Sequence, residues 1–334
     1  MRNGVLIALA AALVTAGAAT GLTAAPAQAG PARAGSAQAG PAQTGPAQAA
    51  EKPSVTAREA YLVDITDGAH GAHGAHGAHG TVQFAKRETR RVPIASLTKV
   101  MTAYVVRRQA RLDDVVTIKQ ADVRHAVAGG ATTAGLRAGE RLTVRDLLYG
   151  LMLPSGADAA HALAEKYGPG TAKFVAKMNA AARRLGLRDT RYANPDGLPS
   201  KAYSTARDQA TLAAAVLRDP VIATVAKTPK RVVGKSAHHR VHVWRNTNDL
   251  LRDGAVGLKT GFTNQAGYCL SFAAVRDGRT YVGVVLGERS DRARFATARR
   301  LLDWAAEGVA EGAGGGAAGG PGGEVMEGAG VILS

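Results

Sequence analysis

Three strand-like runs in the last third of the chain decide which architectures are open to it. They follow one another with only short, glycine-containing turns between them, which is typical of antiparallel hairpins. With two earlier runs, the expected strands cover residues 60–65, 81–87, 256–262, 267–275 and 280–287. An amphipathic helix is expected at 292–308, and the long middle of the chain has helical periodicity. We therefore predict an α+β fold: a mostly antiparallel five-stranded sheet that gathers the early and late strands, flanked by helices, with the middle as a helical subdomain.

The helical middle carries its own start signals. Thr143 is followed three residues later by Asp146, and Thr205 by Asp208. A threonine with an acidic residue three positions on resembles a capping box, in which the threonine side chain accepts a hydrogen bond from the first turn of a helix. These two pairs predict where two of the helices begin.

The N-terminal residues 1–29 have the composition of a secretory signal peptide. A basic start at Arg2 is followed by a long apolar stretch and by the ending Ala27-Gln28-Ala29. We expect cleavage before Gly30, with an uncleaved membrane anchor as the alternative. The mature protein is then expected outside the cell or in the cell wall.

Two further segments lack the composition of a packed domain. Residues 30–52 are a low-complexity linker of Gly, Pro, Ala and Gln, and residues 309–334 are a Gly-rich tail that we expect to be disordered. The folded domain is therefore expected to cover residues 53–308. Its single cysteine, Cys269, cannot form an internal disulfide, so the domain must be held together by its core.

The formal net charge of +16 would suggest nucleic acid as a partner of a cytoplasmic protein. Export argues against nucleic acid and favours the anionic polymers of a cell envelope. An arginine-rich solvated surface without a specific partner is an equally good interpretation.

A triplet Gly-Ala-His, repeated four times, separates the two early strands. Its imidazoles, at His70, His73, His76 and His79, are possible metal ligands. The Gly-Ala spacers impose no geometry, so we prefer a tolerated insertion at a hairpin tip and expect no metal or cofactor.

The segment Ser96-Leu97-Thr98-Lys99 is a candidate nucleophile with its base. A serine hydroxyl needs a base to remove its proton, and three residues of helix place Lys99 about one turn from Ser96 on the same face. Near neutral pH the lysine can act as that base only if its pKa falls by roughly three units from about 10.4, which desolvation or a second cation would favour.

Two more motifs follow in order along the chain. Pro154-Ser155-Gly156 interrupts the helical pattern, which places Ser155 at an exposed break between two helices. Lys259-Thr260-Gly261 lies inside an expected strand. A serine and lysine on a helix, a serine turn and a Lys-Thr-Gly strand, in this order, form the signature of penicillin-interacting serine enzymes.

The chain resembles the D-alanyl-D-alanine carboxypeptidases, the low-molecular-weight penicillin-binding proteins. The matching stretches are PIASLTKVMTAYVV, LLYGLMLPSGADAA, YANPDGLP, YSTARD, NTNDLL and GLKTGFTN. The resemblance implies the β-lactamase/transpeptidase-like fold, a substrate of peptidoglycan stem peptide ending in D-Ala-D-Ala, and β-lactams as inhibitors. It places the acyl group on Ser96 and assigns proton transfer to Ser155. It assigns substrate binding to Lys259-Thr260-Gly261, with the terminal carboxylate on Lys259 and Thr260, and the oxyanion to the backbone N–H groups of Ser96 and Phe262.

The sequence departs from the family pattern at two places. The family usually carries Asn two residues after the serine of the second motif, where this chain has Ala157. We expect an altered contact without loss of catalysis, and expect an asparagine there to speed acylation; a tightly packed small residue is the alternative. The larger members also have a β-rich second domain and an amphipathic C-terminal anchor, and the Gly-rich tail in their place argues against stable membrane attachment.

Other functions remain open at this point. A β-lactamase would need a glutamate to position water, and Glu165 reads instead as a surface residue of a helix. A transpeptidase would use the same residues with a different acceptor. A non-catalytic wall-binding or β-lactam-binding module would not need Ser96, Lys99, Ser155 and Lys259 together.

Overall fold

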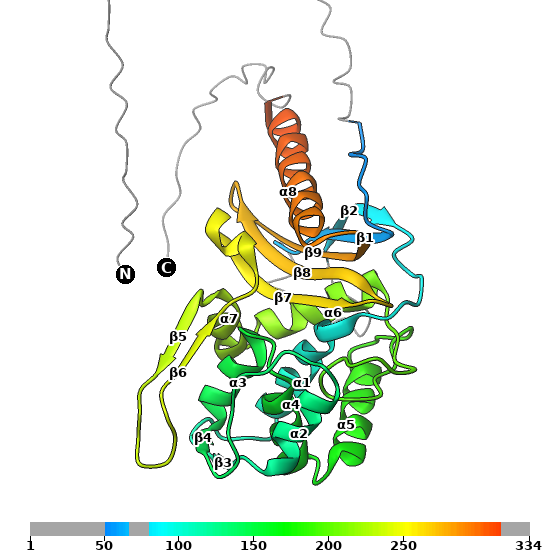
Figure 1. The fold of residues 1–334 in the computed structure, drawn as a ribbon. Coiled ribbons are helices and arrows are strands. Elements are labelled where there is room, and N and C mark those ends of the chain that lie inside the picture. The colour runs from blue at the N-terminus through cyan, green and yellow to red at the C-terminus, as the bar shows by residue number, and fades with distance from the viewer. Residues whose placement is uncertain (1–50, 67–79, 315–334) are drawn as a thin grey trace, which may run out of the picture. The chain divides into compact units, whose positions relative to one another are not determined.

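The early and late strands meet in one antiparallel sheet. The structure, a computed structural model, describes residues 51–66 and 80–314 of the chain. Within these residues the strand order is β2-β1-β9-β8-β7, and every neighbouring pair runs antiparallel (Figure 1). The strands are β1 (Glu59–Asp64), β2 (Thr81–Lys86), β7 (Ala255–Thr263), β8 (Gly267–Arg276) and β9 (Arg279–Glu288). The predicted α+β class and the five-stranded antiparallel sheet are confirmed.

Both faces of the sheet are covered, which explains why its late strands are apolar almost throughout. Along β9, Val282 and Val284 join the core shared with the helical lobe, while Tyr281 and Val285 join a second core under the C-terminal helix α8 (Asp291–Gly314). Helix α6 packs against the opposite face from α8. The sheet is therefore sandwiched between α8 and the helical lobe (Figure 1).

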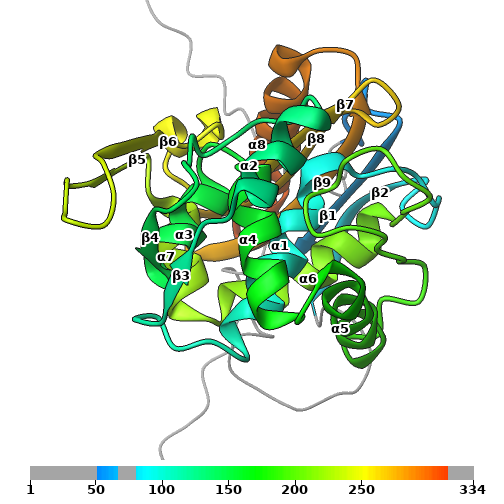
Figure 2. The ribbon, with the colours of Figure 1, turned by 60° about the horizontal axis from the view of Figure 1, so that its bottom comes forward.

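The helical lobe gathers the middle of the chain into one block, which Figure 2 shows turned towards the viewer. Its helices, with α6 and α7 next to the sheet, are α1 (Thr98–Arg107), α2 (Gln120–Ala128), α3 (Val144–Met152), α4 (Ala157–Tyr167), α5 (Thr171–Arg184), α6 (Ala206–Leu217) and α7 (Pro220–Lys227). The two predicted caps are confirmed: Thr143 Oγ1 accepts from the backbone N–H of Asp146 at 3.1 Å, and Thr205 Oγ1 from that of Asp208 at 3.0 Å.

Several short elements were not predicted from the sequence. They are the 3₁₀ turns η2 (Ala95–Leu97) and η3 (Asp249–Asp253) and the strands β3 (Val115–Thr117), β4 (Arg141–Thr143), β5 (Lys230–Val233) and β6 (His242–Arg245). The four strands form two separate two-stranded sheets beside the helical lobe.

The C-terminal helix is longer than the predicted 292–308, because α8 continues to Gly314. Cys269 is buried as a free thiol. The predicted signal peptide, most of the linker, the rest of the tail and the four repeat histidines lie outside the described residues. Of the helices that the structure describes, none combines the length and the apolar character needed to cross a bilayer.

Candidate active site

The predicted nucleophile lies on a strained turn between the sheet and the helical lobe. Ser96 is the middle residue of η2, which runs directly into α1. Ala95 before it has a φ of 49°, a left-handed conformation that is uncommon for a residue with a side chain and typical of functional turns. Lys99 Nζ donates a hydrogen bond to Ser96 Oγ at 3.0 Å, so the expected one-turn separation brings the two groups together.

Lys99 is a buried base. Its side chain is 2% exposed, and its Nζ also donates to the carbonyl oxygen of Asp196 at 2.6 Å. Burial lowers the pKa of Lys99 to about 8, while the carboxylates of Asp196 and Asp158 act in the opposite direction. Of the two causes expected from the sequence, desolvation therefore accounts for the lowering. The two carboxylates that limit it were not anticipated.

Ser155 occupies the break between α3 and α4, as predicted, but the prediction that it is exposed is wrong. Only 6% of the residue is exposed, because the 132–134 segment packs against the break between the two helices. Its φ of 67° is left-handed, and its hydroxyl is buried with no hydrogen-bond partner among the described residues. A free buried hydroxyl at a cavity wall is suited to bind or relay a proton when a substrate arrives.

Strand β7 brings the third motif against the nucleophile. A Cβ added at Gly261 would lie 3.1 Å from both the Ser96 nitrogen and the Ile94 carbonyl oxygen, which is tighter than most Cβ contacts, so a glycine suits this close approach of the strand. Thr260 and Gly261 line the same cavity as Ser96, as does Phe262. The geometry thus brings the backbone at Gly261, next to Phe262, close to the Ser96 nitrogen. An oxyanion site shared by the backbone N–H groups of Ser96 and Phe262 would need such a close approach.

Lys259 lies behind this wall and does not line the cavity. It is 1% exposed, and its Nζ donates to the carbonyl oxygen of Thr260 at 3.0 Å. Burial, with the charges of Lys99 and Arg294, holds the pKa of Lys259 well below its usual range. In this arrangement the hydroxyl of Thr260, and not the ammonium of Lys259, meets an occupant of the cavity.

The cavity has a volume of about 440 Å³ and is formed from both lobes. Its wall includes residues that the motifs did not identify: the segment 129–132, Asp196, Thr247 and Arg294. Arg294, from α8, donates through Nη1 to the carbonyl oxygens of Gly261 and Cys269, and its buried Nε has no partner in the described chain. In the sequence, Arg294 is one of several arginines of an amphipathic helix, and no local pattern distinguishes it from the others.

The segment 129–136, whose first residues line the cavity, is held by α4. The carboxylate of Asp158 accepts backbone hydrogen bonds from Ala134 at 2.7 Å and Leu136 at 3.0 Å. The backbone N–H of Ala157 donates to the carbonyl oxygen of Thr132. The start of α4 therefore fixes the position of this segment at the cavity wall.

Ala157 itself is fully buried and does not line the cavity. This burial favours the alternative of a tightly packed small residue over the expected altered contact. Glu165 is half-buried and accepts from the backbone and the hydroxyl of Thr171, both at 2.8 Å. It is absent from the cavity wall and serves the start of α5.

A serine bonded to a buried lysine, a second hydroxyl and strand backbone within one cavity are the parts that an acyl-transferring serine enzyme needs. The family model described as D-alanyl-D-alanine carboxypeptidase matches residues 47–290. The D-alanyl-D-alanine carboxypeptidase of Streptomyces sp. (strain K15) is 39% identical over 271 residues, which cover 77% of this chain and 89% of that protein.

Solved structures agree with the sequence matches. The crystal structure of the Streptomyces K15 DD-transpeptidase matches with a TM-score of 0.70 at 38% identity, covering 78% of this chain and 99% of that one. The D-alanyl-D-alanine carboxypeptidase DacD from Francisella tularensis matches with a TM-score of 0.66 at 28% identity, covering 76% and 71%. The chain therefore belongs to the D-alanyl-D-alanine carboxypeptidase family of serine hydrolases, penicillin-binding enzymes of the cell wall.

Proposed function

We propose that this chain is an exported serine carboxypeptidase that removes the terminal D-Ala from peptidoglycan stem peptides ending in D-Ala-D-Ala, and that β-lactams inhibit it by acylating the same serine. The observation that carries the proposal is the 3.0 Å hydrogen bond between Lys99 Nζ and Ser96 Oγ at the wall of the cavity. The proposed export depends on the signal-peptide pattern of residues 1–29, and a basic surface would suit anionic wall polymers.

The reaction proceeds through an acyl-enzyme. Ser96 Oγ attacks the carbonyl carbon of the penultimate D-Ala while its proton passes to neutral Lys99. The oxyanion is held by the backbone N–H groups of Ser96 and Phe262. The C–N bond then breaks, and the leaving amine of D-Ala takes a proton through the hydroxyl of Ser155. Water hydrolyses the ester and restores Ser96.

The terminal carboxylate is placed by hydroxyl and cation together. Thr260, whose Oγ1 is 2.6 Å from Thr247 Oγ1, presents its hydroxyl to the cavity, and Arg294 adds a cation from α8. Lys259 lies directly behind Thr260 and supplies positive potential once it is protonated. Two buried lysines in one site disfavour each other's charge, so a carboxylate that draws a proton onto Lys259 also favours the neutral form of Lys99. Substrate binding would in this way prepare the base.

A second candidate function is transfer of the acyl group to an amine instead of water. The solved neighbour from Streptomyces K15 is named a DD-transpeptidase, while the sequence relative from the same strain is named a carboxypeptidase. Both reactions share the acyl-enzyme on Ser96 and differ in the acceptor.

The test measures D-alanine release from an N-acylated L-Lys-D-Ala-D-Ala peptide, with and without glycine as acceptor amine. We expect release by the parent protein and none by Ser96→Ala, which should also fail to bind fluorescent penicillin covalently while keeping the parent melting temperature. Release that persists in Ser96→Ala would overturn the proposal. A product carrying glycine in place of D-Ala at millimolar acceptor would favour the transpeptidase.

A further inference from the structure

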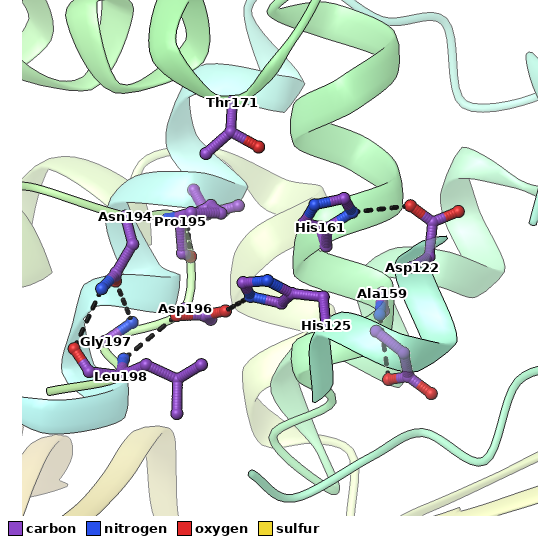
Figure 3. Close-up of polar contacts among 12 residues, drawn as sticks. Asp122, His125, Ala159, His161, Thr171, Asn194, Pro195, Asp196, Gly197 and Leu198 are labelled. Atoms are coloured by element: carbon purple, nitrogen blue, oxygen red, sulfur yellow. Dashed lines mark hydrogen bonds and ion pairs between the residues drawn. The ribbon is translucent and has the colours of Figure 1, made fainter. Parts of the chain in front are cut away.

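The carbonyl oxygen that accepts a hydrogen bond from Lys99 Nζ belongs to a short loop, residues 194–198. This loop is held by hydrogen bonds between its own side chains and backbone. Asn194 Oδ1 accepts from the backbone N–H of Gly197 at 2.7 Å, and Asn194 Nδ2 donates to the carbonyl oxygen of Leu198 at 2.9 Å. Asp196 Oδ1 accepts from the backbone N–H of Leu198 at 3.0 Å. Figure 3 shows these bonds around one small turn. The position of the Asp196 carbonyl therefore depends on what holds the turn as a unit.

One side chain from another element holds the Asp196 carboxylate. His125, on α2, places its Nε2 2.5 Å from Asp196 Oδ2 (Figure 3). The side chain of Asp196 is completely buried, and that of His125 is 27% exposed. A buried carboxylate needs such a partner, because an unpaired charge in this position would be costly. The hydrogen bond to Asp196 raises the pKa of His125, against the effect of burial.

Ionisable groups from three other elements, α1, α4 and the 194–198 loop, lie around His125. Its ring packs on that of His161 from α4, with 4.4 Å between the centroids, and His161 Nδ1 is itself 2.7 Å from Asp122 Oδ1. Asp122 favours a positive charge on His125, and Lys99 on α1 disfavours it. The Asp196 carboxylate of the 194–198 loop is the group in direct contact, so it dominates.

We propose that His125 is a positioning residue for the lysine base: it holds the Asp196 carboxylate, and with it the carbonyl that binds Lys99 Nζ, and in its protonated form it screens Lys99 from that carboxylate. The inference rests on the function proposed above, in which Lys99 takes the proton of Ser96. Three contacts in sequence carry it, from His125 to Asp196 at 2.5 Å, from the Asp196 carbonyl to Lys99 at 2.6 Å and from Lys99 to Ser96 at 3.0 Å.

The charges facing Lys99 give the direction of the effect. The carboxylates of Asp196 and Asp158 both raise its pKa against the effect of burial. Lys259, from β7, and Arg294, from α8, are the basic groups that share the site. A protonated His125 makes the Asp196 pair neutral as a whole, so it offsets one of the two carboxylates. Removal of that positive charge would leave Lys99 beside an unscreened carboxylate and make it harder to deprotonate.

Two near-isosteric variants separate the charge from the hydrogen bond. His125→Gln keeps a donor near the position of Nε2 and removes the charge, while Asp196→Asn removes the carboxylate and keeps the turn. We measure the rate of Ser96 acylation by fluorescent penicillin in the full-length protein between pH 5 and pH 10. The midpoint should rise by about one pH unit in His125→Gln, about tenfold slower at pH 7, and should fall in Asp196→Asn. His125→Ala, which also loses the bond, should lower the rate on the high-pH plateau as well.

The matched control is His242→Gln. His242 is a buried histidine beside a carboxylate, with Nε2 3.2 Å from Glu140 Oε1, but this carboxylate, unlike that of Asp196, does not line the cavity. It should titrate at the parent midpoint. An unchanged midpoint in both His125→Gln and Asp196→Asn, or a shift of both in the same direction, would overturn the inference. A parent protein that penicillin does not acylate at any pH would instead overturn the proposed function, so the two failures are distinguishable.

Discussion

At Gly197, a single added methyl group should push the 194–198 loop away from the turn that carries Ser96. Its φ is +84°, and a Cβ built on it would lie 1.9 Å from the carbonyl oxygen of Ala95 and 2.9 Å from the nitrogen of Ser96. Both neighbours are backbone atoms of the η2 turn, so neither can rotate away as a side chain would. Gly197→Ala must therefore displace the turn of Ser96, the loop of Asp196, or both.

The size of the displacement follows from the contact distance. A carbon atom approaches a carbonyl oxygen to about 3.3 Å, so the two backbones must separate by about 1.4 Å. The hydrogen bond from Lys99 Nζ to the Asp196 carbonyl, now 2.6 Å, would then exceed hydrogen-bond length if the loop moves away from Lys99. A misplacement of this size near reacting groups costs about 100-fold in rate. The left-handed backbone conformation adds about 1–2 kcal/mol of instability for alanine.

Gly254→Ala is the control for backbone strain alone. Gly254 has a φ of +75°, and a Cβ there would meet nothing within 4 Å. Both variants should melt a few degrees below the parent, but only Gly197→Ala should lose penicillin acylation and D-alanine release. If Gly197→Ala were acylated within about threefold of the Gly254→Ala rate, the contact between this loop and the nucleophile would not matter for catalysis, and the reasoning would fail.

Three further predictions concern the site itself. Acylation of the parent should rise with pH through a midpoint near 8, where Lys99 loses its proton, and Lys99→Arg should not be acylated because a guanidinium stays charged; near-parent acylation of that variant would identify another base. Lys259→Ala should lower kcat/KM for the natural substrate, because the positive potential behind Thr260 is lost, and amidation of the substrate C-terminus should therefore cost this variant less than it costs the parent; equal losses in both would place the carboxylate elsewhere. Ala157→Asn should lower the melting temperature by about 4–8 °C, from roughly 2 kcal/mol of overpacking at a fully buried site, without faster acylation; faster acylation at an unchanged melting temperature would show that this side chain reaches the cavity.

The parts of the fold that were predictable are those that local sequence determines. Glycine-containing turns between β-branched runs define hairpins, and a threonine with an acidic residue three positions later defines a helix start. The five main strands and the two caps follow these rules and were found where expected. Strands β3 to β6 were missed because each has only three or four residues, too few to show an alternation.

The candidate site divides in the same way. The separation of Ser96 and Lys99 is a property of one helical turn, so the sequence gives it directly. The burial of Ser155 and Lys259 depends on how the two lobes close over the motifs, which no local pattern encodes. His125 and Asp196 are 71 positions apart in the chain, and only the packing of α2 against the 194–198 loop brings them together.

The chemistry of the site consequently depends both on the three motifs and on the residues around them. The motifs fix where the nucleophile and its base lie, but the protonation of Lys99 depends on its burial and on the carboxylates of Asp158 and Asp196. The effective charge of Asp196 depends in turn on His125, which lies outside all three motifs. Two chains with the same Ser-x-x-Lys, serine turn and Lys-Thr-Gly can therefore work at different pH if they differ at the position of His125. A substitution of His125 would therefore change the pH range of this enzyme without altering a group that contacts the substrate.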